Sequence, residues 1–229
     1  EDAFDFNQNI GTWNTAAVTN MSGMFIDAYA FNQNIGTWNT GAVTNMDRMF
    51  DFATAFNQNI GTWNTAAVTD MRGMFADAED FNQNIGTWTL NPAVNLSNML
   101  NNSGMDCSNY SATLIGWNAN PATPNGRTLG AIGRQYGTNA AAARTNLIST
   151  KLWTITGDTP SGTVCSSVPT ITSFAPANGP IGTTVTITGT NFSSTSANNI
   201  VYFGATRATV TSATPTQLTV SVPLGATYQ

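Results

Sequence analysis

The sequence predicts a repeat solenoid that is leucine-rich-repeat-like (α/β), with short parallel strands and helical turns. A small α/β cap and a C-terminal all-β, Ig-like sandwich are predicted to follow it. Three observations lead to this fold class. The peptide Phe-Asn-Gln-Asn-Ile-Gly-Thr-Trp begins at residues 6, 31, 56 and 81, which gives a period of 25 residues. Two helix-like segments come after the fourth repeat, and short runs of alternating apolar and polar residues come after those.

Each repeat holds its apolar residues in fixed columns. A unit of this size cannot bury them alone, so stacked neighbours are expected to share one continuous core. Residues 10–14 are predicted to form a short strand, and residues 18–25, with apolar side chains at i, i+3, i+6 and i+7, a turn of helix. The columns of the first repeat are Phe6, Ile10, Trp13, Val18, Met21, Met24 and Phe25. The regular placement of the methionines favours core packing over a methionine-lined binding surface.

Amide side chains also fall into columns. Asn7, Asn9 and Asn14 recur in later repeats. Stacked about 4.8 Å apart, such amides can bond one another and the backbone of the coils. Charged residues vary from repeat to repeat instead. Asp47 and Arg72 share one column and would pair across adjacent coils, with little effect on stability.

We place the repeats at residues 1–105, the cap at 106–160, a linker at 161–168 and the sandwich at 169–229. Residues 2–5 align with residues 27–30, so the sequence starts inside a preceding unit, and further repeats are expected upstream.

The cap and the sandwich are predicted from local signals. Residues 108–117 are expected to form a helix capped by Ser108, and residues 139–151 a second helix capped by Thr138. A strand is expected at residues 153–156. The strands of the sandwich are predicted at residues 169–174, 185–188, 200–203, 208–210 and 218–222. About 60 residues is short for such a sandwich, so its last strand or two are expected beyond Gln229.

Two family resemblances cover nearly the whole chain. The repeats resemble the BspA-like, leucine-rich-repeat-related bacterial surface repeat, marked by Phe-Asn-x-x-Ile-x-x-Trp and then Val-Thr-x-Met-x-x-Met-Phe. The cap resembles the segment that often ends such arrays. Residues 169–229 resemble an IPT/TIG domain, on Pro169, Ile171, Phe174, Pro176, Gly179, Gly182, Gly189, Phe192, Phe203 and Pro223. These resemblances imply secreted or cell-surface modular proteins with adhesive or glycan-related roles, and they supply no ligand or functional site.

The composition excludes several classes of function. Seven Lys and Arg stand against 12 Asp and Glu, for a formal charge of −5, and 8% of residues are charged, where an ordinary domain has about 25%. So few cations cannot neutralise a run of phosphates, which excludes a nucleic-acid partner. No apolar stretch approaches the roughly 18 residues that a membrane span requires.

Catalysis is not expected. The chain has no His, which removes the usual general base, the Ser–His nucleophile and the imidazole metal ligand. A carboxylate pair can hydrolyse glycosides, but the acidic residues fall in the variable part of the repeat, which favours a solvated face. No cofactor is predicted. Asp2 and Asp27 would be stacked neighbours, yet no calcium loop motif surrounds them, so no metal is predicted either.

Two columns are candidate ligand surfaces. The Trp column is either an exposed row for stacking sugars or a buried row whose indole N–H groups reach carbonyl oxygens, and its regularity favours the core. The Thr column lies two residues from Asn14 and its equivalents and would form a flat polar array able to order water or ice. The residues are Trp13, Trp38, Trp63 and Trp88, with Thr12, Thr37, Thr62 and Thr87.

Cys107 and Cys165 are the only cysteines and bracket the cap. In a secreted protein an even pair at module edges indicates a disulfide. Two buried thiols are the alternative. The chain-entropy relation gives such a bond roughly 4 kcal/mol of stabilisation.

These observations predict a non-enzymatic fragment of a bacterial cell-surface or secreted protein, acting in adhesion or as a structural or interaction module. The expected partners are a host or cell-surface protein or a glycan, together with further repeats and domains of the same chain. The alternative is a carbohydrate-binding protein that uses the Trp column. A minor alternative is ice binding by the Thr and Asn array.

Overall fold

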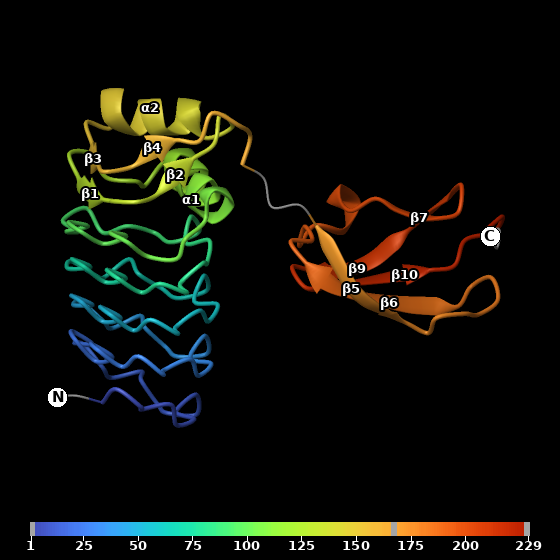
Figure 1. Ribbon diagram of the computed structural model, residues 1–229, viewed down its shortest axis with the longest axis horizontal. Coiled ribbons are helices and arrows are strands. Elements are labelled where there is room, and N and C mark those ends of the chain that lie inside the picture. Colours follow the sequence, from blue (N-terminus) through green and yellow to red (C-terminus); the bar gives the residue numbers. More distant parts are fainter. Residues whose placement is uncertain (1–2, 166–168, 227–229) are drawn as a thin grey trace. The chain divides into compact units, whose positions relative to one another are not determined.

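The computed structural model describes residues 3–165 and 169–226. The chain divides into two compact units, Glu1–Ser166 and Ser167–Gln229, and each is described by itself. The first contains the repeats and the cap, and the second contains the β-strand module (Figure 1).

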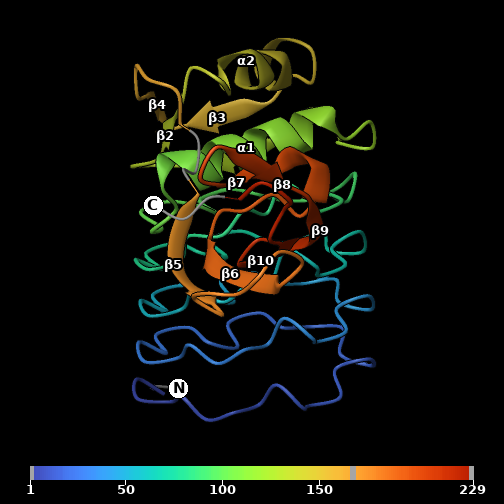
Figure 2. The ribbon, with the colours of Figure 1, turned by 90° about the vertical axis from the view of Figure 1, so that its right-hand side faces the viewer.

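The repeats form coils that lie one above another (Figures 1 and 2). Single parallel β-bridges join equivalent residues of successive coils, Asn20 to Asn45, Asn45 to Asp70 and Asp70 to Asn95. Residues 3–106 contain no α-helix and no extended strand. The strand predicted at residues 10–14 and the helical turn predicted at residues 18–25 are therefore wrong, since non-helical turns occur in both segments.

Backbone N–H groups near the bridges alternate between two kinds of partner. Those of Met21 and Gly23 donate to carbonyls of the next coil, at 2.8 and 2.9 Å. Those of Met24 and Ile26 donate to carbonyls three residues back, at 3.3 and 3.2 Å. An α-helix would direct every N–H four residues back along its own segment. Bonding between coils takes half of these donors, so the predicted helix does not form.

Two positions in every coil have a positive φ. One column consists of Gly23, Arg48, Gly73 and Asn98, and the other of Asp27, Phe52, Asp77 and Asn102. Gly, Asn and Asp tolerate this left-handed conformation better than other residues do, which explains why Asp recurs in the second column. Arg48 and Phe52 are the exceptions, and both belong to the second coil.

Phenylalanine rings fill the middle of the stack. Phe25 stacks on Phe31 with ring centroids 3.9 Å apart. The equivalent pairs, Phe50 with Phe56 and Phe75 with Phe81, are 3.9 and 3.8 Å apart. One continuous apolar core extends from Ile10 to Trp153, which confirms the predicted shared core.

The amide columns bond from coil to coil, as predicted. Asn7 Oδ1 accepts a hydrogen bond from the backbone N–H of Asn32 at 3.0 Å and from the side chain of Gln33 at 2.8 Å. The same two contacts recur at Asn32 and at Asn57. Each amide therefore holds the beginning of the next coil in place.

The cap covers the last coil. It consists of α1 (Cys107–Ala119), β1 (Thr128–Gly130), β2 (Gln135–Tyr136), α2 (Ala141–Ser149), β3 (Thr154–Thr156) and β4 (Thr159–Pro160). β1 pairs with β3, and β2 with β4, both in parallel. Helix α1 approaches the fourth coil closely because Gly116 faces Gly86, and a Cβ on Gly116 would lie 2.5 Å from the Gly86 carbonyl oxygen.

Both predicted caps are wrong. Asp106 caps α1, and its side chain accepts a hydrogen bond from the backbone N–H of Asn109 at 2.8 Å, so Ser108 lies inside the helix. The N-cap of α2 is Ala140, which makes no side-chain hydrogen bond, so Thr138 does not cap that helix.

The second unit is all-β, as predicted. Its elements are β5 (Thr170–Ala175), β6 (Thr184–Thr190), the 3₁₀ turn η1 (Ser196–Asn198), β7 (Val201–Phe203), β8 (Thr206–Ala208), β9 (Val210–Thr214) and β10 (Gln217–Ser221). Strands β5, β6, β10 and β9 form an antiparallel sheet in that order, and β7 pairs with β8. Its buried core includes Val185, Ile187, Leu218 and Val220. The last three residues of the predicted linker and the last three residues of the predicted sandwich lie outside the described residues.

Candidate functional site

The Trp column is buried between the coils and is not a sugar-binding surface. Trp38, Trp63 and Trp88 are only 4, 4 and 1% exposed. Their indole N–H groups donate to the carbonyls of Ile10, Ile35 and Ile60, one coil back, at 3.1, 3.2 and 3.1 Å. Trp13 is 53% exposed because it belongs to the first described coil. The carbohydrate-binding alternative that relies on an exposed Trp column is therefore wrong.

The Thr and Asn columns do lie on the surface. The hydroxyls of Thr37, Thr62 and Thr87 donate to the carbonyls of Gly11, Gly36 and Gly61 at 3.2, 3.2 and 2.8 Å. The Oδ1 atoms of Asn14, Asn39 and Asn64 accept backbone N–H groups two residues on. The face therefore presents hydroxyl oxygens and amide N–H₂ groups in fixed rows. Ice binding by this array stays a prediction.

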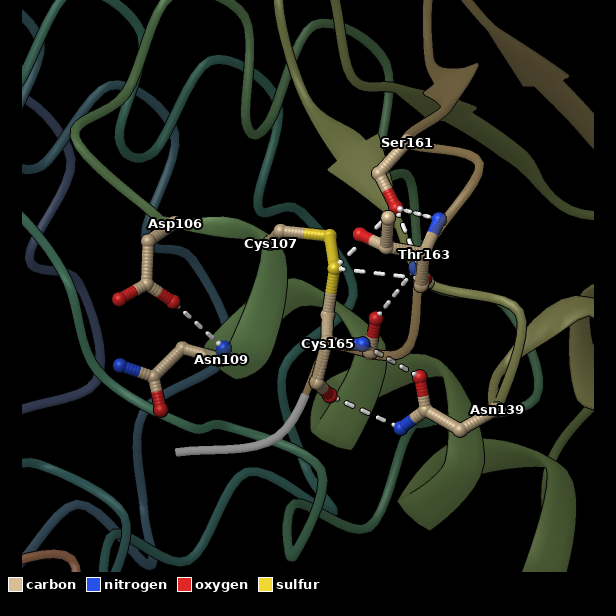
Figure 3. Close-up of a disulfide and its surroundings, with 9 residues drawn as sticks. Asp106, Cys107, Asn109, Asn139, Ser161, Thr163 and Cys165 are labelled. Carbon is tan, nitrogen blue, oxygen red and sulfur yellow. Dashed lines mark hydrogen bonds between the residues drawn. A yellow bond between two sulfur atoms is a disulfide. The ribbon is translucent and has the colours of Figure 1, made fainter. Parts of the chain in front are cut away.

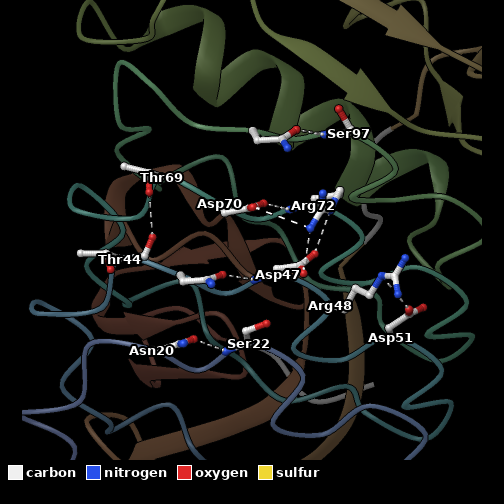
Figure 4. A network of polar contacts seen from close by, with 12 residues as sticks. Asn20, Ser22, Thr44, Asp47, Arg48, Asp51, Thr69, Asp70, Arg72 and Ser97 are labelled. Atoms are coloured by element: carbon white, nitrogen blue, oxygen red, sulfur yellow. Dashed lines mark hydrogen bonds and ion pairs between the residues drawn. The ribbon is translucent and has the colours of Figure 1, made fainter.

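A cluster of charged side chains occupies another part of the coils (Figure 4). Arg72 forms a bidentate pair with Asp47, with Nε–Oδ1 and Nη2–Oδ2 distances of 3.1 and 3.0 Å, so the predicted contact exists. Arg48 Nε lies 3.7 Å from Asp51 Oδ2 in the second coil. The Asp51 side chain is 13% exposed, whereas that of Arg48 is 58% exposed.

The environment of Asp51 disfavours its charged form. Burial raises the pKa of Asp51 from 3.8 to about 6. Arg48 acts in the opposite direction, and the carboxylates of Asp77, Asp27 and Asp47 add to the increase. Asp51 also lines a pocket of about 250 Å³, together with Arg48, Phe52, Asp77, Asn98 and Asn101.

This pocket was missed in the sequence. The signal was present, because Arg48 replaces a Gly or Asn, and Phe52 an Asp or Asn, found at the same column in the other coils. If the columns had been compared for residue types that tolerate a positive φ, as well as for polarity, both residues would have stood out as departures from the repeat.

The predicted disulfide is present (Figure 3). Cys107 is the first residue of α1, and its Cα lies 5.6 Å from that of Cys165. Asn139 holds Cys165 from both sides: its Oδ1 accepts the Cys165 N–H at 3.0 Å, and its Nδ2 donates to the Cys165 carbonyl at 2.9 Å. The bond thus ties the first part of the predicted linker, which follows the cap, to the beginning of α1.

The cap also contains a buried charged network. The Asp158 side chain is fully buried and accepts hydrogen bonds from Arg144 Nε at 2.7 Å and from Tyr110 Oη at 2.9 Å. The Arg144 guanidinium lies 4.8 Å from the centre of the Tyr136 ring. Burial raises the pKa of Tyr110, so this hydroxyl stays protonated as a donor. The network joins α1, α2 and the segment before β4, which gives it a structural role.

Residues 3–165 and 169–226 contain neither a cluster of metal ligands nor a membrane-spanning helix. No group of three or more Asp, Glu or Cys side chains in this part of the chain is placed to hold a metal ion. Asp2, one of the two stacked carboxylates considered above, lies outside the described residues. No described helix has both the length and the apolar composition needed to cross a membrane.

The architecture is that of a modular protein in which a repeat region and its cap precede a β-strand module. Residues 1–113 match the family described as "Mycoplasma protein of unknown function, DUF285". Residues 169–228 match the IPT/TIG domain. These matches agree with the two predicted modules. Comparison with curated proteins and with solved structures gave no match.

Proposed function

We propose that this chain is part of a non-enzymatic, bacterial cell-surface or secreted protein, and that its repeats form a solenoid whose polar face binds an adhesion partner. The IPT/TIG domain would act as a spacer or a second interaction unit. The two matched families suit a surface or interaction module. The disulfide suits an oxidising, extracellular compartment.

The regular Thr and Asn face carries the proposal. Its hydroxyl and amide groups are already bonded to the backbone of the same or the preceding coil. A partner would therefore have few side chains to immobilise on binding, which lowers the entropic cost of association. A regular polar surface of this kind suits a protein partner, for which a standard interface covers about 800 Å² on each side.

The chemistry of the described residues supports a non-catalytic role. The chain has no His, and both cysteines are oxidised in the disulfide. The carboxylate of Asp158 is fully buried and is bonded to Arg144 and Tyr110. None of these groups is placed as an accessible general base or nucleophile.

A cell-binding assay tests the proposal. Fluorescently labelled chain is added to cultured host epithelial cells, with and without prior protease treatment of the cells. We expect saturable binding that the protease removes. The double variant Asn39→Arg with Asn64→Arg should abolish binding. The matched control is Asp5→Arg with Asp80→Arg, which changes two exposed residues of another column.

Two results would contradict the proposal: no saturable binding, or equal binding by both double variants. Binding that survives protease and is lost after glycosidase treatment would favour a glycan as the ligand.

A further inference from the structure

We propose that the pocket on the charged side of the coils binds one basic side chain, a lysine or an arginine, of a partner protein. This inference rests on the proposed function, because it assigns a partner chemistry and a site to the interaction module. It is carried by the size of the pocket, the carboxylate that lines it, the surrounding charge and an exposed aromatic ring.

The pocket has the size for a single side chain. Its volume is about 250 Å³, which is below the roughly 300–1,000 Å³ typical of sites for whole small molecules. Its lining comes from the second, third and fourth coils. The coils are joined by backbone bonds and a shared core, so the site is formed before any partner arrives.

Asp51 supplies a carboxylate whose ion pair with Arg48 is loose. Its side chain is 13% exposed, and among the described residues the cation nearest to it is Arg48, at 3.7 Å. A charge-assisted N–H···O bond is about 2.7–2.9 Å long. The described residues donate no hydrogen bond to this carboxylate. An incoming ammonium or guanidinium could therefore make a contact that the chain itself does not make.

The charge around the pocket favours a cation. Arg72 is already paired with Asp47 through two hydrogen bonds, so its charge is largely compensated (Figure 4). The carboxylates of Asp77, Asp27 and Asp47 all raise the pKa of Asp51, as negatively charged neighbours do. The pocket lining itself holds Asp51 and Asp77 against Arg48 and Arg72, and with the neighbouring Asp27 and Asp47 the region has four carboxylates for two guanidiniums. An anionic ligand would meet net repulsion here, and a cationic one net attraction.

Phe52 gives the pocket an aromatic wall. Its ring is 45% exposed, and the residue has a φ of 57°. The other coils have Asp27, Asp77 and Asn102 in this column, residues better suited to that conformation. An exposed aromatic face beside a carboxylate attracts a cation through its quadrupole. Such a ring also covers the aliphatic part of a lysine or arginine side chain.

Arg48 indicates how the site accommodates its ligand. Its guanidinium is largely solvent-exposed and reaches Asp51 only loosely (Figure 4). A long ion pair with one solvent-exposed partner contributes little to stability. A partner side chain could displace Arg48 into solvent and take over the contact with Asp51.

A titration with two short peptides tests the proposal on the full chain. The probes are acetyl-Gly-Lys-Gly-amide and the matched neutral peptide acetyl-Gly-Gln-Gly-amide, followed by NMR at pH 7. We expect the lysine peptide to shift the Asp51 signals and to bind at least tenfold more tightly than the glutamine peptide. Asp51→Asn should weaken lysine-peptide binding at least tenfold, and Phe52→Asn by a few-fold. Asp80→Asn, which removes an exposed carboxylate that does not line the pocket, should leave binding unchanged.

Several outcomes would overturn the proposal. They are equal binding of the two peptides, unchanged binding in a folded Asp51→Asn variant, and equal losses in Asp51→Asn and Asp80→Asn. Asn is tolerated at the Phe52 position, so Phe52→Asn tests the pocket in a chain that folds. The experiment does not depend on cell binding. A chain that binds the lysine peptide but no cells would contradict the adhesion role and leave the pocket assignment intact.

Discussion

The indole N–H of Trp38 donates a hydrogen bond to the carbonyl of Ile10, one coil before it, at 3.1 Å. Trp63 and Trp88 make the same bond to Ile35 and Ile60. Each Trp thereby fixes the register of its coil on the preceding one, while its ring is withdrawn from water. The column joins coils to each other, so replacing its members should affect stability and not ligand binding.

Trp63→Phe tests this role. The variant keeps an aromatic ring in the core and removes the donor to Ile35, which leaves a buried carbonyl with one partner fewer. We expect a loss of about 1–3 kcal/mol in the free energy of unfolding, measured by urea denaturation. Trp13→Phe is the control, because Trp13 is half exposed and makes no such bond to the described residues. Equal losses in the two variants would contradict the assignment.

Substitutions in the two columns with a positive φ are predicted to stabilise the chain. Arg48→Gly and Phe52→Asn place residues in the second coil that suit a positive φ. Each should raise the free energy of unfolding by about 1 kcal/mol. The melting temperature, measured by differential scanning calorimetry, checks this.

Gly23→Ala is the opposite change in the same column. The nearest atom to the new Cβ would be 3.9 Å away, so the substitution meets no steric clash beyond its own backbone. With a φ of 61° at Gly23, we expect a loss of about 1–2 kcal/mol. No change in melting temperature would show that φ does not constrain this column.

Much of the fold could be predicted from the sequence because identical repeats constrain one another. The burial of Ile35, Val43 and Met46 follows from their columns alone, since apolar residues repeated at a fixed spacing must face a shared interior. The bond from Asn7 to Asn32 follows from the amide columns in the same way. The local backbone structure could not be predicted from the columns in this way. Apolar spacing at residues 18–25 predicted a helical turn, but it carries no information on whether an N–H bonds within its segment or to the next coil.

The candidate site was less predictable. The regularity of the Trp column favoured a buried position for Trp38, which agrees with its burial, but it did not identify the carbonyl of Ile10 as the partner of the indole N–H. The pocket at Asp51 depends on two residues, Arg48 and Phe52, that depart from the repeat. The disulfide was predictable because only two cysteines exist and they bracket the cap.

The stability of the chain should depend on pH through Asp51. Its pKa is about 6 in the folded chain and ordinarily 3.8, so the folded state binds more protons between about pH 4 and pH 6. Stability should therefore fall as the pH rises through this window and stay level above it. Asp51→Asn should remove that fall and stabilise the chain by on the order of 1 kcal/mol at pH 7, once screening by solvent is considered.

Urea denaturation of both proteins from pH 4 to pH 7 checks this prediction. The other carboxyl groups titrate in both proteins, so the difference between the two curves reports on Asp51. A difference that does not change with pH would contradict the assignment.

The disulfide should stabilise the cap more than the coils. Thiol labelling of the denatured, unreduced chain should detect no free thiol, since Cys107 and Cys165 are bonded. Reduction should then lower the free energy of unfolding by up to about 4 kcal/mol and increase hydrogen exchange in α1 and α2. Exchange in the central coils should change little, because each coil contacts only its neighbours. Two reactive thiols in protein from an oxidising compartment would contradict the bond.

Two arginines that each form a bidentate ion pair should differ sharply in their contribution to stability. Arg144→Met leaves the fully buried Asp158 without its cation, and we expect a loss of about 3–5 kcal/mol. Arg72→Met breaks an equally well-formed pair with Asp47. The Arg72 side chain there is 47% exposed, so the loss should not exceed about 1 kcal/mol. The two variants change the net charge equally, so urea denaturation compares a buried ion pair with an exposed one. Equal losses would show that burial does not determine how much each ion pair contributes to the free energy of unfolding.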